Sequence, residues 1–257
     1  MLSRNMKTRL LATVSSIALA GGAIAADYPV KARPLAPAAP WTGFYLGLNT
    51  GAAWHHWAHN DVNNFLSLVP GLTGPTVFDN NEFWSGTKAA FTFGGQAGYN
   101  WQSSNLVYGI EADLNWVNAK SDTSFPDRIL AFGNVIASTK MDWLATVRGR
   151  LGVTFSPTMV YLTGGFALAH VKDYFSATGF PSNAIAATND KTLAGYAIGA
   201  GVEHMLSSDW SVKAEALYVG LKNTSGTAFR AGNTYQTEFK HSAVLARLGI
   251  NRKFSPK

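Results

Sequence analysis

Apolar and polar side chains alternate with a period of two through most of the chain after residue 40. Because successive side chains of a strand point to opposite faces, the alternation predicts β-strands. Each stretch is longer than the five or six residues usual in soluble sheets. The eight expected strands are Gly43–Trp54, Lys88–Gln102, Leu106–Lys120, Lys140–Phe155, Met159–Lys172, Thr192–Met205, Trp210–Lys222 and Phe239–Phe254.

The connections between these strands alternate between short and long. The short ones are Ser103–Asn105, Ser156–Thr158 and Leu206–Asp209. The long ones are His55–Thr87, Ser121–Thr139, Asp173–Lys191 and Asn223–Glu238. Outer-membrane barrels have short periplasmic turns and longer extracellular loops. The sequence therefore predicts an all-β fold, an eight-stranded antiparallel up-and-down transmembrane barrel with both chain ends in the periplasm.

Alternation alone does not say which face meets lipid, since a soluble barrel of lipocalin type buries its apolar face. Two features favour an apolar face turned outward. Small residues fill the polar face, as a cramped lumen requires, and aromatic residues recur near strand ends, as at membrane interfaces. These aromatic residues are Trp54, Trp101, Trp116, Trp143, Phe155, Trp210 and Phe254.

Residues 1–25 have the features of a secretory signal peptide. Arg4, Lys7 and Arg9 precede the apolar run 10–20, and small residues lead to a cleavage site between Ala25 and Ala26. The apolar run is too short for a membrane-spanning helix, which needs about 20 residues. Export to the outer membrane of a Gram-negative cell follows.

Residues 26–40 contain four prolines and predict an extended periplasmic linker, which leaves 41–257 for the barrel. Lys31 and Arg33 could contact the cell wall, although a solvated linker explains them equally simply. The formal charge of +6 falls to +3 without the three cations of the leader, too small a surplus to indicate nucleic acid. The chain has no cysteine, which excludes disulfides and thiolate chemistry.

Charged residues occupy the lumen face of the expected strands. Eight strands enclose a space just wide enough for side chains, and an unpaired buried charge is costly, so these groups should pair and plug the barrel. The alternative is a narrow gated pore for small solutes, lined by the same charges. The set comprises Glu111, Asp113, Arg148, Arg150, Glu203, Lys213, Glu215 and Arg247.

Two candidate chemistries depend on histidine. His55, His56 and His59, beside Trp54 and Trp57, could bind haem or a transition metal, but an interfacial tryptophan belt with loop histidines explains them as well. His241-Ser242 near a strand end lacks a recognisable third catalytic member. The glycine pairs near Gly94 lie within a strand, which excludes a phosphate loop. We expect no enzyme and no cofactor.

Several motifs resemble the small outer-membrane β-barrel proteins of alphaproteobacteria. They are Trp41-Thr42-Gly43-Phe44-Tyr45-Leu46-Gly47, Gly94-Gly95-Gln96-Ala97-Gly98-Tyr99-Asn100-Trp101, Tyr108-Gly109-Ile110-Glu111-Ala112-Asp113, Thr146-Val147-Arg148-Gly149-Arg150-Leu151-Gly152, Tyr161-Leu162-Thr163-Gly164-Gly165 and Trp210-Ser211-Val212-Lys213-Ala214-Glu215.

The resemblance implies an OmpA-like or porin-family barrel that supports envelope integrity and is exposed as a surface antigen, with some relatives binding haem or acting as adhesins. Its expected partners are outer-membrane lipid, lipopolysaccharide and the barrel-assembly machinery. Such chains usually end on an aromatic residue, whereas here Ser255-Pro256-Lys257 follow Phe254, and Arg252 stands where an outward aromatic residue is expected.

Overall fold

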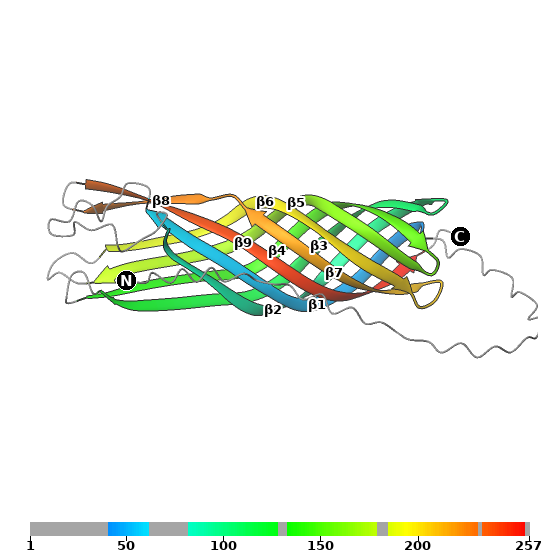
Figure 1. Ribbon diagram of the computed structural model, residues 1–257, viewed down its shortest axis with the longest axis horizontal. Helices are drawn as coiled ribbons and strands as arrows, with labels where there is room; N and C mark the ends of the chain where they lie inside the picture. The colour runs from blue at the N-terminus through cyan, green and yellow to red at the C-terminus, as the bar shows by residue number, and fades with distance from the viewer. Residues whose placement is uncertain (1–40, 62–81, 128–132, 179–184, 231–232, 255–257) are drawn as a thin grey trace, which may run out of the picture. The chain divides into compact units, whose positions relative to one another are not determined.

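The computed structural model describes residues 41–61, 82–127, 133–178, 185–230 and 233–254, and these form one closed antiparallel sheet (Figure 1). The strands are β1 Gly43–Asp61, β2 Glu82–Ser103, β3 Leu106–Asp127, β4 Gly133–Phe155, β5 Thr158–Thr178, β6 Ile185–Met205, β7 Trp210–Leu221, β8 Thr224–Arg230 and β9 Asn233–Phe254. No helix among the described residues is long and apolar enough to cross a membrane.

Sequential strands pair with each other from β1 to β7, and pairing between β1 and β9 closes the sheet into a barrel. Both β7 and β8 pair with β9, one after the other along its length, so they are two pieces of one barrel strand interrupted at Lys222 and Asn223. The described residues thus make an eight-stranded up-and-down barrel, and the predicted fold class is confirmed. We call the end with the β2–β3, β4–β5 and β6–β7 turns the turn end, and the other the loop end.

The apolar face of the sheet points outward. Along β7 exposed and buried positions alternate from Trp210 onward. Leu48 and Phe166 are 67% and 80% exposed, which in water would leave large apolar surfaces unprotected. Six of the seven aromatic residues predicted at strand ends are 41–68% exposed, and Trp143 is half-buried against the ring of His170. An outward apolar band with aromatic edges fits a bilayer.

The strands extend further toward the loop end than the alternation predicted. β4 begins at Gly133 where Lys140 was expected, and β5 continues to Thr178 past Lys172. Much of the expected last loop is a hairpin of β8 and the start of β9. Ladder hydrogen bonds continue to satisfy the backbone there, whereas alternating hydrophobicity is needed only where one face meets lipid.

Several predictions fall outside the described residues. The signal peptide, its cleavage site at Ala25 and Ala26, and the linker 26–40 belong to the undescribed first 40 residues, and Ser255-Pro256-Lys257 follow the last described residue. The central parts of the expected long loops, 62–81, 128–132, 179–184 and 231–232, also lie outside the described residues.

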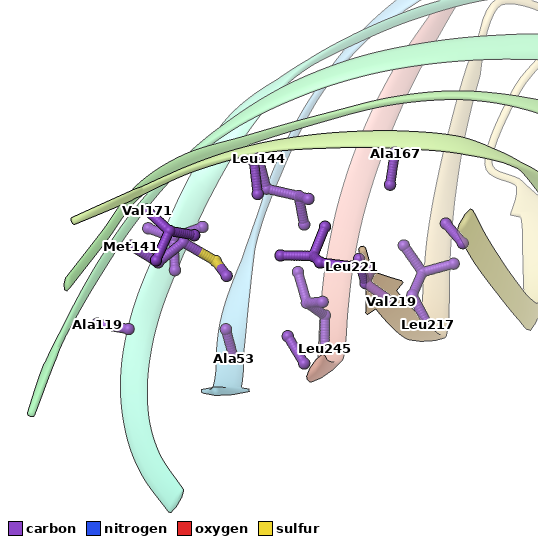
Figure 2. Close-up of a cluster of buried hydrophobic side chains, with 14 of the residues drawn as sticks. Ala53, Ala119, Met141, Leu144, Ala167, Val171, Leu217, Val219, Leu221 and Leu245 are labelled. Atoms are coloured by element: carbon purple, nitrogen blue, oxygen red, sulfur yellow. The ribbon is translucent and has the colours of Figure 1, made fainter. Parts of the chain in front are cut away.

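The interior is not polar throughout. Toward the loop end, inward-facing apolar side chains fill the barrel, and Figure 2 shows them converging between the strands. Leu144, Leu217 and Leu245 are at most 2% exposed. The expectation of a uniformly polar lumen is therefore wrong for this half, because these positions meet other side chains across a narrow interior and can pack as a core.

Candidate functional site

The eight charged residues assigned to the lumen from the sequence all lie inside the barrel, between the apolar layer and the turn end. Each is at most 5% exposed. Glu111 and Asp113 come from β3, Arg148 and Arg150 from β4, Glu203 from β6, Lys213 and Glu215 from β7, and Arg247 from β9. Inward alternation on five strands brings them into one network.

Glu111 is the centre of this network. The ammonium of Lys213 lies 2.9 Å from both of its carboxylate oxygens, and the guanidinium of Arg148 donates to Oε1 at 2.7 Å. Arg150 Nη1 lies 3.4 Å from Oε2. Three cations from two strands therefore surround one carboxylate in a region closed to water.

Two arginines and two carboxylates form a ring of alternating charge beside it. Arg148 donates to Asp113 Oδ2 at 2.8 Å and to Glu215 Oε2 at 3.0 Å. Arg247 donates to Asp113 Oδ1 at 2.9 Å and to Glu215 Oε1 at 2.5 Å. Each carboxylate thus bridges two guanidinium groups, and charge-assisted contacts of this kind are the strongest hydrogen bonds in proteins.

Arg150 connects the network to two tyrosines. Its guanidinium donates to Glu203 Oε2 at 2.6 Å and to the Tyr45 hydroxyl at 2.7 Å, while its Cζ lies 4.1 Å from the centre of the Tyr161 ring. The Tyr45 hydroxyl in turn donates to Glu111 Oε2 at 2.8 Å. The sequence analysis assigned no role to Tyr45 or Tyr161.

Uncharged polar residues complete the network. Asn251 donates to Glu203 Oε1 at 2.7 Å, and the Ser211 hydroxyl donates to the same oxygen at 2.5 Å. Gln96 donates to Asn251 Oδ1 at 2.5 Å. These residues share the inward parity of the charges on their own strands, and this signal could have identified them.

The turn end of the lumen is closed by a second apolar group consisting of Trp41, Val107, Met159, Tyr161 and Met205. The cavity there measures only about 10 Å³, hardly space for one water molecule. A larger concavity of about 780 Å³ is lined mainly by outward side chains such as Leu48, Phe93 and Leu248, so it is a hollow of the lipid-facing surface. The lumen is therefore filled at three levels: apolar, ionic and apolar.

The structure separates the histidines considered for haem or metal. His55 points into the barrel and is 1% exposed, whereas the exposed His56 points outward and lies 3.0 Å from the Thr87 hydroxyl. The side chain of His59 lies outside the described residues. Because neighbouring residues of a strand face opposite ways, His55 and His56 cannot approach one ligand together.

His55 belongs to a different group above the loop-end apolar layer. His55 Nε2 lies 3.3 Å from His241 Nδ1, and His241 Nε2 lies 3.3 Å from Asp173 Oδ2. The Thr139 hydroxyl donates to Asp173 Oδ1 at 2.6 Å. Ser242 follows His241 on the outward side of the strand, so the two do not form a nucleophile and base. Among the described residues, no set of three histidine or acidic side chains is placed to hold a metal ion.

A closed barrel with an apolar exterior, aromatic edges and a charged, filled interior defines a class: the transmembrane β-barrels of bacterial outer membranes. The chain matches the model of the outer membrane protein beta-barrel domain family over residues 15–238 and belongs to that family.

The relatives have the same location. The chain is 36% identical to the 31 kDa outer-membrane immunogenic protein of Brucella melitensis, over 97% of this chain and 100% of that protein. It is 30% identical to the 22 kDa outer membrane protein of Rhizobium leguminosarum, over 86% of this chain and 82% of that protein. Among solved structures, OprG from Pseudomonas aeruginosa is similar with a TM-score of 0.47 at 12% identity, covering 86% of this chain and 100% of that one. The protein is located in the outer membrane.

Proposed function

We propose that this protein is a closed, non-conducting barrel that strengthens the outer membrane and presents its loops at the cell surface. The observation that carries the proposal is the filled lumen, in which the ring of Arg148, Asp113, Arg247 and Glu215 lies between two apolar layers. Ions crossing this space would have to displace several buried charge pairs, each costly to break. A role in envelope integrity and antigenicity is supported by the name of the Brucella relative.

Planar-bilayer recording tests the closed lumen. The purified barrel should give no steady single-channel steps, and Arg148→Ala should not change this unless it destabilises the barrel, which a heat-dependent shift in gel mobility detects. Steady conductance of the wild-type barrel that Arg148→Ala reduces or abolishes would show that the charges line a pore for small solutes.

Surface presentation can be tested with introduced cysteines, because the native chain has none. Ser225 is exposed on β8 at the loop end, and Ser207 is exposed in the β6–β7 turn. A membrane-impermeant maleimide on intact cells should label Ser225→Cys and not Ser207→Cys. The reverse pattern would invert the barrel and remove the proposal.

The contribution to the envelope is tested in a deletion strain. We expect increased sensitivity to bile salts and large antibiotics, restored by the wild-type gene and equally by Ser225→Cys. A deletion strain with unchanged sensitivity would contradict a role in integrity.

We also propose that the barrel works without a cofactor and without catalysis. His55 and His56 point to opposite faces of β1, which argues against a shared iron or metal ion. Titration with haemin should give the same spectrum for the wild type and for a triple alanine variant of His55, His56 and His59. A specific absorbance band lost in the variant would revive the receptor hypothesis.

A further inference from the structure

Three lysines occupy consecutive register positions on the outer face of the barrel. Lys120 on β3 is opposite Lys140 on β4, and Lys140 is opposite Lys172 on β5. The side chains of these residues, which we call the lysine row, are 58%, 39% and 47% exposed. Their neighbours in the chain, among them Ala119 and Val171, are buried inside, so the lysines point outward.

Two irregularities in the sheet create this alignment. At the level of the tryptophans, Trp116 is opposite Trp143, and this register continued would place Lys120 opposite Thr139. A shift between Trp116 and Ala119 moves Lys120 opposite Lys140 instead. A second shift, between Met141 and Trp143, likewise aligns Lys140 with Lys172. Bulges of this kind re-aim side chains.

The row lies beside the aromatic edge of the apolar band. Lys140 is three residues beyond Trp143 along β4, roughly 10 Å of strand, and less along the membrane normal because barrel strands are tilted. That height matches the polar headgroup layer, which is several ångströms thick on each side of the hydrocarbon. The ring of His170 stacks on Trp143 at 6.0 Å and adds a polar group at the same level.

Like charges directly opposite each other destabilise a sheet. Neighbouring carboxylates compensate in part: Asp122 lies 2.8 Å from Lys120, and Asp142 lies 2.5 Å from Lys140 and 3.6 Å from Lys172. The Lys120 ammonium and the Ser138 hydroxyl hold the pKa of Asp122 below its ordinary value, so this carboxylate stays ionised. Each ammonium has three N–H donors and uses only one or two in these contacts. Donors toward the lipid side remain for a further anion.

We propose that the lysine row and His170 form a docking site for the phosphate groups of an anionic lipid headgroup in the outer leaflet, such as a bisphosphorylated lipid A. The height, the outward direction and the sign of the charges select this partner, because phosphate is the anion that the surrounding lipid presents at this level. The site depends on the outer-membrane location and not on whether the lumen conducts.

A matched control lies on another strand. Lys240 on β9 also points outward near the loop end, is 46% exposed and has Glu238 at 3.9 Å, but its register partner on β1 is Ala58. It has the same charge and a similar exposure without neighbouring lysines in register. Its substitution removes one cation and leaves the row intact.

The experiment compares the wild type with K120A/K140A/K172A, K120R/K140R/K172R and K240A. Each barrel is incorporated into phosphatidylcholine nanodiscs that contain bisphosphorylated lipid A or the same lipid without phosphates, and bound lipid is counted by native mass spectrometry. The triple alanine variant should retain at least about tenfold less bisphosphorylated lipid, because each basic residue beside an anionic lipid surface contributes to binding. The arginine variant and K240A should retain wild-type amounts.

Three results would overturn the proposal. They are equal retention by the triple alanine variant and the wild type, equal retention of the lipid without phosphates, and displacement of lipid by millimolar inorganic phosphate, which would make free phosphate the ligand. Heat-dependent gel mobility confirms that each variant is folded. If the triple alanine variant does not fold, Lys140→Ala and Lys172→Ala are compared singly with K240A, and unchanged retention in both contradicts the site.

Discussion

The ammonium of Lys213 lies 2.9 Å from both carboxylate oxygens of Glu111, although 102 positions separate the two residues in the chain. The contact crosses the lumen from β7 to β3, which are not neighbouring strands. It therefore holds the barrel wall together across its interior, in addition to the hydrogen bonds between adjacent strands. Because neither side chain is exposed, loss of one partner leaves a buried charge.

Glu111→Gln should destabilise the barrel by about 3–5 kcal/mol, because Lys213, Arg148 and Arg150 lose a shared counter-charge. Urea unfolding of the barrel in detergent, followed by gel mobility, measures the free energy of unfolding. The control is Asp122→Asn, whose ion pair with Lys120 is more than half exposed and should contribute under about 1 kcal/mol. Equal losses in the two variants would contradict a network that depends on burial.

Leu144→Ala should cost about 2–5 kcal/mol, because the fully buried side chain packs in the loop-end apolar layer and its truncation leaves a cavity. The outward Leu162, 66% exposed toward lipid, is the matched control, and Leu162→Ala should cost under about 1 kcal/mol. The same unfolding measurement applies. A larger loss at Leu162 would mean that the apolar layer is not a core.

Gly98→Ala should destabilise the barrel and disturb the ionic network. A Cβ at this position would overlap the hydroxyl of Tyr45, which donates to Glu111, and would approach the carbonyl oxygen of Ile110 to 2.6 Å. Gly95→Ala on the same strand meets only the carbonyl oxygen of Gly47 at 3.8 Å and should be tolerated. Thermal transitions followed by circular dichroism distinguish the two, and equal midpoints would refute the steric argument.

Asp173→Ala should lower the free energy of unfolding by about 1–3 kcal/mol, since it leaves the buried hydroxyl of Thr139 without its acceptor and His241 without its carboxylate. Asp190→Ala removes a carboxylate that is 54% exposed and should change it by under about 1 kcal/mol. Urea unfolding of both variants tests this. A neutral result at Asp173 would show that the polar group above the apolar layer contributes nothing to stability.

Much of the fold could be predicted because lipid imposes a strict pattern. A one-residue shift of β4 would turn Arg148 and Arg150 toward hydrocarbon, at about 2–4 kcal/mol each near the midplane, so alternation alone identifies which side chains enter the lumen. The same rule gave the strand order, since short turns force neighbouring strands to pair. The rule applies only within the membrane, and the strand ends beyond it, such as Thr178 on β5, were not predicted.

The pairing inside the lumen could not be predicted. Parity placed Glu111 and Lys213 in the interior, but which cation meets which carboxylate depends on the closure of β1 against β9 and on side-chain reach across the barrel. The histidines near β1 illustrate the same limit, because His55 found its partner 186 positions away, at His241.

The sequence by itself determined the class of fold, the membrane-facing surface and the set of buried charges, because alternation is a local property that bilayer and lumen each reward directly. Only the tertiary structure decided how the interior is layered and how Lys120, Lys140 and Lys172 align. The physical reason is that an inward position meets residues from other strands, and a bulge shifts register without altering the alternation of either strand's pattern of apolar residues in a way that is visible beforehand.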